Sequence, residues 1–204
     1  DTAETMIQVV QASLIGSILG NLLLVLGLAF VWGGIHHKVQ KFSHVQIGAN
    51  GSLLLLAVIA LILPTAYQYT GSGHEDAIIT LSRLTAIVLL AMYGLFLLFQ
   101  FRTHTHLFAT DGVHEEEPVV MGKRQAMYLL IGATVMVAWM AEIMVHSIES
   151  AADKWGLPTL FIGVILLPLF GNAAEHFTAV NVAGKNKMDL AFSIAVGSST
   201  QIAV

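Results

Sequence analysis

The chain has 204 residues, of which 56% are hydrophobic and 11% are charged. A soluble domain of this length needs a more highly charged surface, so the composition predicts an all-α integral membrane protein. The formal net charge is −4 and the nine Lys and Arg residues are scattered, which excludes a nucleic-acid-binding surface. Because the chain has no cysteine, disulfides, thiolate metal sites and cysteine nucleophiles are excluded as well.

Six apolar stretches are long enough to cross about 30 Å of hydrocarbon as helices. Polar or glycine-rich connections separate them, and the last stretch runs to the end of the chain. The first residue is Asp1 rather than Met, so we expect a fragment or a processed chain. The six predicted transmembrane helices cover residues 7–33, 47–69, 77–101, 124–148, 157–183 and 188–204.

The basic residues predict the orientation of these helices. If six helices alternate across the bilayer, only Arg83 and Lys154 lie on one side. The positive-inside rule then places the opposite side in the cytoplasm. The acidic connection, with the sequence HEEEP, would also be cytoplasmic, either as a solvated loop or as a segment that gathers cations. The cytoplasmic basic residues would be Lys38, Lys41, Arg102, Lys123, Arg124, Lys185 and Lys187.

The fourth predicted span carries two ionisable residues, Glu142 and His146, one helical turn apart. An ionisable side chain at membrane depth is costly and commonly marks an ion or proton pathway. These two lie toward the outer end of their helix, so they could also reach the interface or pair within the bundle. Both interpretations stay open.

The fifth predicted span contains the sequence PLFGNAAEHFTAVN, with three polar residues near its middle. On a helix Asn172, Glu175, His176 and Ala179 would share one face. Pro168 and Gly171 precede them and are expected to break the helix and free backbone carbonyls. Carboxylate, amide and carbonyl oxygens are the ligands that Ca²⁺ prefers, so this segment predicts a Ca²⁺ site.

The first and sixth spans share a weak internal repeat. At an offset of 180 residues, Ser13 of SLIGSILGN aligns with Ser193 of SIAVGSSTQ, and Asn21 aligns with Gln201. Small residues also serve helix packing in membranes, so packing and cavity lining are both open. Five helices separate the two copies, and an odd number predicts inverted topology, as in many transporters.

The run GNAAEHFTAVNVAGKNKMDLAFSIAVGSSTQIA resembles the second signature repeat of the Ca²⁺/cation-proton exchanger family, within the cation/Ca²⁺ exchanger superfamily. The run VVQASLIGSILGNLLLVLG resembles the latter half of the first repeat, whose GN-and-Glu motif would precede Asp1. The resemblance implies an inverted-repeat exchanger fold of eleven helices. In it, residues 1–101 are the remainder of the first repeat, 102–123 a cytoplasmic acidic linker, and 124–204 the start of the second repeat.

The resemblance also implies roles for individual residues. Asn172 and Glu175 would bind the ion within the motif 171–176, and His176 would lie beside them. Glu142 would belong to a gating helix and take part in proton coupling with Glu175 and His176. The residues lining the ion cavity would be Ser13, Ser17, Ser198, Ser199 and Gln201.

The function implied is a Ca²⁺/H⁺ antiporter that exports Ca²⁺ from the cytoplasm, with Glu175 binding metal and protons in turn. Na⁺-coupled Ca²⁺ exchange and a cation channel remain alternatives. An intramembrane metallohydrolase is disfavoured, because Val180 stands four residues after His176 and no HExxH motif occurs.

The expected partners are Ca²⁺ as transported substrate, H⁺ and the lipid bilayer, without an organic cofactor, an enzymatic activity or a nucleic acid. A homo-oligomer is left open. The expected location is the cell membrane in a prokaryote or a vacuolar-type membrane in a eukaryote.

Overall fold

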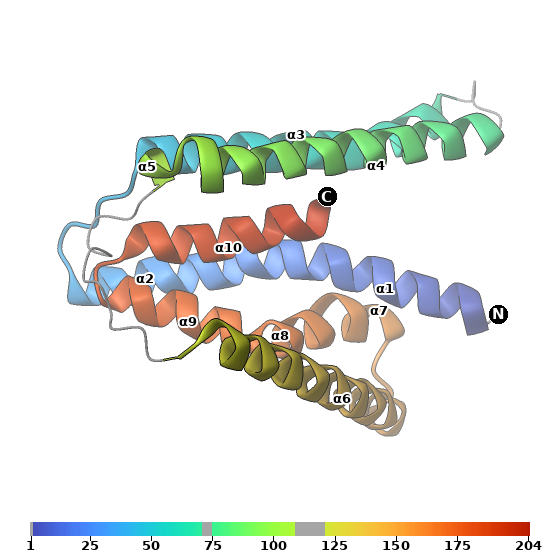
Figure 1. Cartoon of the computed structure of the whole chain (residues 1–204). Coiled ribbons are helices and arrows are strands. Elements are labelled where there is room, and N and C mark those ends of the chain that lie inside the picture. Colours follow the sequence, from blue (N-terminus) through green and yellow to red (C-terminus); the bar gives the residue numbers. More distant parts are fainter. Residues whose placement is uncertain (1, 71–74, 109–120) are drawn as a thin grey trace. The chain divides into compact units, whose positions relative to one another are not determined.

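The structure is a computed structural model that describes residues 2–70, 75–108 and 121–204. Within these ranges every regular element is helical, which confirms the predicted all-α class (Figure 1). Three short segments, η1 to η3, have the wider π-helical winding that often accompanies functional sites. The elements are α1 (Thr2–Leu19), η1 (Gly20–Val25), α2 (Leu26–His36), α3 (His44–Tyr69), α4 (Glu75–Leu98), η2 (Phe99–Thr103), α5 (Thr105–Phe108), α6 (Lys123–Trp155), α7 (Thr159–Phe161), η3 (Ile162–Leu166), α8 (Leu167–Gly171), α9 (Ala173–Gly184) and α10 (Met188–Ala203).

Four continuous helical stretches are long and apolar enough to cross a bilayer, and a fifth forms if a broken pair counts as one span. The continuous stretches are Ile7–His36, His44–Tyr69, Asp76–Thr103 and Lys123–Met144. The broken pair joins Ile162–Gly171 to Ala173–Gly184. α10 has 16 residues, so the predicted count of six spans stays a prediction.

The chain divides into two compact units, each built from separate parts of the sequence. One contains residues 1–16 and 111–173, and the other contains residues 17–110 and 174–204. Each unit therefore draws on both predicted repeats, and the division into repeats at residues 101 and 124 stays a prediction. The HEEEP part of the acidic linker lies outside the described residues.

In the second unit, α10 packs against η1, α2 and α3 through small side chains (Figure 1). Ala179 of α9, Val25 of η1 and Ala195 of α10 form one buried cluster. Alanine lets helix backbones approach closely, which is a common way to pack helices where lipid removes the hydrophobic drive. Two similar clusters extend this seam, Ala29–Ala183–Met188–Ala191 and Ala57–Leu89–Ala203.

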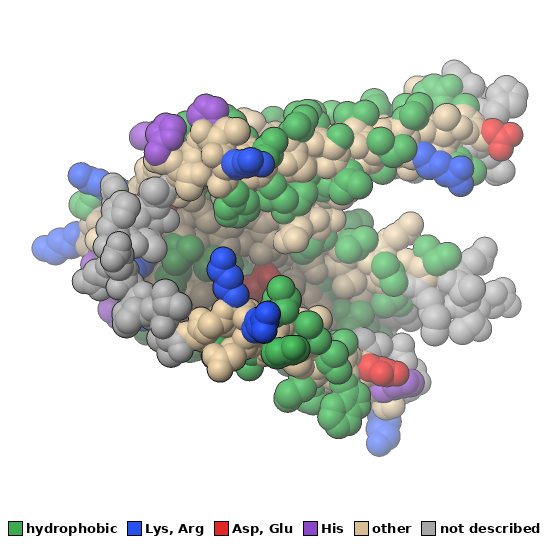
Figure 2. Space-filling view, viewed as in Figure 1, with side chains coloured by type: hydrophobic (Ala, Val, Ile, Leu, Met, Phe, Trp, Pro, Cys, Tyr) green, Lys and Arg blue, Asp and Glu red, His purple; other side chains and the backbone are tan. Residues whose placement is uncertain are grey.

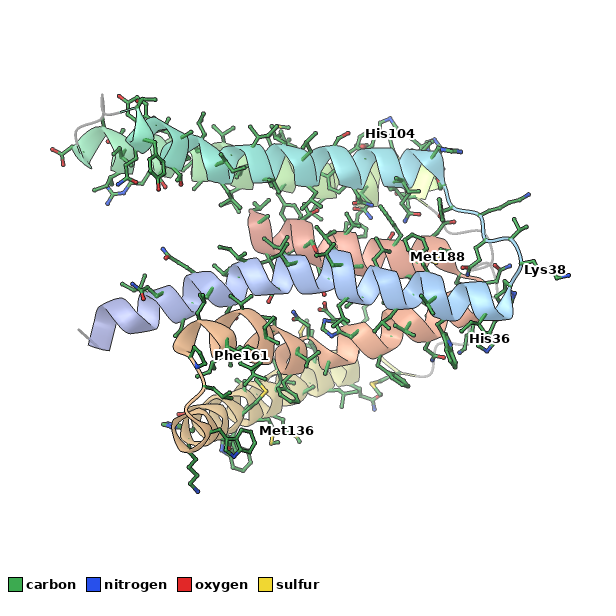
Figure 3. All side chains as sticks on the ribbon, turned by 180° about the vertical axis from the view of Figure 1, so that it is seen from behind. His36, Lys38, His104, Met136, Phe161 and Met188 are labelled. Atoms are coloured by element: carbon green, nitrogen blue, oxygen red, sulfur yellow. The ribbon has the colours of Figure 1, made fainter. Side chains whose placement is uncertain are left out.

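The α2–α3 connection holds the junction of α9 and α10 by hydrogen bonds. His37 Nε2 donates to the Gly184 carbonyl at 2.9 Å, and Gln40 Nε2 donates to the Ala183 carbonyl at 3.0 Å. Both bonds satisfy carbonyls at the C-terminal end of α9, which have no partner within the helix. The connection leaves α2 near His36 and Lys38, at the same end of the unit as Met188 (Figure 3).

In the first unit, the N-terminal part of α1 packs against η3 and α8 through two glycines. A side chain at Gly16 would collide with the Val164 carbonyl oxygen and approach Pro168 Cγ to 2.8 Å. A side chain at Gly163 would come within 2.9 Å of Ala12 Cβ. Each glycine therefore allows a backbone-to-backbone contact that any larger residue would prevent.

Large apolar side chains remain exposed along the helices of both units. Leu90 on α4 is 64% exposed and Val137 on α6 is 67% exposed. In Figure 2, hydrophobic side chains run along the paired α3 and α4 helices, with acidic and histidine side chains at their ends. Such a surface fits lipid as the surrounding solvent, and the chain is an integral membrane protein.

Candidate functional site

The fifth predicted span is broken at Asn172, as its sequence suggested. α8 ends at Gly171, α9 begins at Ala173, and Asn172 has φ −102° and ψ 11° between them. Pro168 lies in the first turn of α8, where its missing N–H costs nothing, so the interruption falls four residues later. Asn172 is therefore the residue at the break and does not share a helical face with Glu175, as we had expected.

The residues of α9 divide between its packed and open sides. Ala179 and Ala183 are fully buried in the alanine seam. Glu175 and Thr178, three residues apart, instead line an open cavity in the second unit. α9 thus holds Glu175 on a helix whose other side is fixed by close packing.

Glu175 makes a side-chain hydrogen bond to α10. The Ser198 hydroxyl donates to Glu175 Oε2 at 2.7 Å, across 23 residues of sequence. Hydrogen bonds to a charged acceptor are about twice as strong as those between neutral groups. This bond orients one carboxylate oxygen and leaves the other to the cavity.

The cavity has a volume of about 520 Å³ and is lined by α3, α4, η2, α9 and α10. Glu175 is the single charged side chain among its lining residues, all of which belong to the described second unit. Three of the predicted site residues line it together, namely Glu175, Ser198 and Gln201. The remaining polar lining residues are Asn50, Tyr93, Gln100, Thr178, Ser193 and Thr200.

Two other predicted residues of this unit are buried and lie outside the cavity lining. Ser199 is fully buried, and its hydroxyl donates to the Ala195 carbonyl at 2.8 Å and approaches the Ile18 carbonyl at 3.5 Å. Ser17 is also buried. In this structure both serines contribute to helix packing. Ser13 and Asn172 belong to the other compact unit.

Two predicted residues carry buried polar atoms without a hydrogen-bond partner among the described residues. These atoms are His176 Nε2 and Asn172 Nδ2. A buried polar atom of this kind requires an explanation, such as a role in ligand or proton binding. His176 Nε2 is therefore free to bond water or to take up a proton, which keeps its predicted proton-coupling role open.

Glu142 and His146 lie apart from Glu175 in the division of the chain, on α6 of the first unit. Both are exposed and line a cavity of about 550 Å³ with Trp139, Ile143 and Ser147 of the same helix. Every lining residue of this cavity comes from α6, so it is a groove on the surface of one helix. The gating role of Glu142 stays a prediction.

The sequence analysis missed the cavity wall that α3 and α4 form. Asn50 and Gln100 are polar residues within apolar stretches, which was a usable signal. Tyr93 gave no such signal, because tyrosine is common in membrane helices. Among the described residues, no group of three or more His, Asp or Glu lies together, so a metal site here would rest on one carboxylate and neutral oxygens.

Comparison with known proteins gives a consistent family. The sodium/calcium exchanger protein family matches residues 3–102 and 125–204. A Ca²⁺/H⁺ antiporter of Aphanothece halophytica is 46% identical, and the match covers 98% of this chain and 57% of that protein. The vacuolar cation/proton exchanger 3 of Arabidopsis thaliana is 40% identical, with 99% of this chain and 48% of that protein covered.

A solved structure is similar as well. The crystal structure of the selenium-substituted Ca²⁺/H⁺ antiporter protein YfkE is 37% identical and has a TM-score of 0.70. The match covers 96% of this chain and 55% of that one. The chain thus spans about half to three-fifths of the length of these relatives. The resemblance to Ca²⁺/cation-proton exchangers that the sequence suggested is confirmed.

Proposed function

Because this chain belongs to the sodium/calcium exchanger protein family, we propose that the protein is a Ca²⁺/H⁺ antiporter that exports Ca²⁺ from the cytoplasm. The observation that carries the proposal is the cavity in which Glu175 is the single charged lining residue and is oriented by Ser198. The names of the similar antiporters support the same substrates.

The proposed mechanism is competition between Ca²⁺ and protons for Glu175. A carboxylate must lose its proton to bind a metal ion, so the proton and Ca²⁺ exclude each other at that group. Ca²⁺ takes six to eight oxygens, which one carboxylate cannot supply. We assign the further ligands to Ser198 and Gln201, which line the same cavity, and to Asn172 at the helix break, with Ser13, Ser17 and Ser199 as the remaining predicted members.

Proton transfer would involve His176 beside Glu175 and Glu142 on α6. The proton gradient then drives Ca²⁺ across the membrane, and each net charge moved is worth about 2.3 kcal/mol per 100 mV. The expected partners are Ca²⁺, H⁺ and the bilayer. No organic cofactor is required by this chemistry.

The test measures ⁴⁵Ca²⁺ uptake, driven by a pH gradient, into everted vesicles that carry the full-length protein. We expect Glu175→Gln to slow uptake at least about 10-fold, because the amide has no charge to bind Ca²⁺ and no proton to exchange. Asp76→Asn is the matched control, since Asp76 is an exposed carboxylate outside the cavity. Uptake by Glu175→Gln at the rate of the unchanged protein would refute the proposal.

Sodium dependence is the second arm of this experiment, because the family as a whole is described by sodium/calcium exchange. Replacing Na⁺ by an impermeant cation should leave uptake unchanged if protons are the driving ion. A loss of uptake on Na⁺ removal would instead favour the Na⁺-coupled alternative.

A further inference from the structure

Polar residues on one face of α3 pair with α10 in a regular ladder. The backbone N–H of Ser43 donates to Asp189 Oδ1 at 2.6 Å, and one turn later Gln46 Nε2 donates to Ser193 Oγ at 2.7 Å. Both pairs advance along their helices in the same direction, so α3 and α10 run parallel (Figure 1). The same advance of four residues places Asn50 opposite Gly197.

The ladder is incomplete at Asn50. Gly197 has no side chain to meet the carboxamide, and a Cβ built there would find no neighbour within 4 Å. Asn50 is only 5% exposed, yet it makes no side-chain hydrogen bond within the described residues. An unsatisfied buried polar group costs about 1–3 kcal/mol, which a purely structural role does not explain.

The missing partner coincides with open space. Asn50 and Gly197 both line the cavity that contains Glu175, on walls formed by α3 and α10. Gln46, one turn earlier, is satisfied by Ser193 and does not line it. The one unpaired amide of the ladder is thus the one that reaches the cavity.

We infer that Asn50 is a further positioning residue of the ion site, whose amide oxygen holds the hydrated side of the divalent cation that Glu175 binds. This inference rests on the proposed function. A cavity of about 520 Å³ is far larger than a bare cation, so a bound ion keeps several water molecules. Neutral amide oxygens and water complete the shell of a hard cation without adding charge that would slow its release.

Two measurements on the full-length protein test the inference, Ca²⁺ binding by equilibrium dialysis with ⁴⁵Ca²⁺ and the dependence of vesicle uptake on Ca²⁺ concentration. We expect Asn50→Ala to raise both the Kd and the KM for Ca²⁺ about 10-fold, as for other groups that support metal ligands. The maximal rate and the thermal stability should change little. Ser52→Ala is the control, since Ser52 is exposed on α3 outside the cavity.

A second variant covers the case in which Asn50→Ala fails to fold. Asn50→Asp keeps the shape and an oxygen ligand but adds a carboxylate that protons can neutralise. We expect a folded protein that binds Ca²⁺ and whose Kd depends more steeply on pH. A misfolded Asn50→Asp, or a pH dependence equal to that of the unchanged protein, would overturn the inference.

Glu175→Gln separates this inference from the proposed function. If Glu175→Gln abolishes uptake while Asn50→Ala leaves the KM and Kd unchanged, only the role of Asn50 is wrong. If Glu175→Gln transports normally, the proposed function is wrong as well.

Discussion

Glu175 and Ser198 show how a single side-chain contact organises the cavity. The two residues lie on α9 and α10, and the serine hydroxyl fixes one carboxylate oxygen by a 2.7 Å hydrogen bond. The neighbouring Ser199 points its hydroxyl into its own helix instead. Successive residues of a helix lie about 100° apart, so two adjacent serines cannot both face the same cavity.

The two serines therefore make a testable pair. We expect Ser198→Ala to raise the Ca²⁺ concentration for half-maximal uptake about 10-fold, because groups that hydrogen-bond a ligating carboxylate contribute 10–100-fold to metal affinity. Ser199→Ala should have a smaller effect on this concentration and a larger one on thermal stability. The measurement is uptake by full-length protein at varied Ca²⁺, together with the melting temperature in detergent.

The reverse order of effects would place Ser199 at the ion and Ser198 in the packing. In that case the contact seen between Ser198 and Glu175 would not be the one that matters for transport.

Among the elements, α1 and η3 depend on glycine for their contact. Gly16 faces the Val164 carbonyl and Gly163 faces Ala12 Cβ, so neither position has room for a methyl group. Gly27 in α2 lies next to open space, where an added methyl group meets nothing within 4 Å. The same residue type thus serves close packing at two positions and not at the third.

We expect Gly16→Ala to destabilise the protein by about 1–3 kcal/mol, the usual cost of overpacking a close contact. Gly27→Ala should be neutral or stabilising by about 0.5–1 kcal/mol, since alanine is the better helix former. Thermal unfolding of both variants in the same detergent checks this difference. Equal melting temperatures would mean that the α1–η3 contact contributes little to stability.

The sequence predicted the elements better than their internal detail. Hydropathy located the spans because it reports residence in lipid, but α6 continues to Trp155, past the predicted end at 148. Its polar last turns stay helical because helix formation does not require apolar residues. The π-helical segments, and the exact break at Asn172, depend on packing with other helices, which hydropathy does not register.

The candidate site was predictable only in part, for the same reason. Glu175, Ser198 and Gln201 stood out because they are polar within spans that resemble a known repeat. The opposite wall comes from α3 and α4, more than 70 residues away in sequence, and only the folded chain brings Asn50 and Tyr93 to it. The binding roles of all these residues stay predictions until the variants are measured.

For the whole molecule, the absence of cysteine allows a direct test of orientation. Lys38 and Lys154 are both exposed, and the charge distribution predicts that they lie on opposite sides of the membrane. Lys38→Cys and Lys154→Cys each introduce one thiol into a background without others. We expect a membrane-impermeant maleimide to label Lys154→Cys on intact cells and Lys38→Cys only after permeabilisation.

The unchanged protein is the control for this labelling, because it has no thiol to react. Labelling of both variants from the outside would contradict the predicted alternation of helices. The opposite pattern would invert the whole chain and place the acidic linker outside the cytoplasm.

The alanine seam that joins η1, α2, α9 and α10 limits how this molecule can move. Alanine has no χ1 rotamers, so such a contact has no alternative side-chain arrangement into which it can relax. Helices joined in this way behave as a stator, and any step that exposes Glu175 to one side of the membrane and then the other must slide along a different surface.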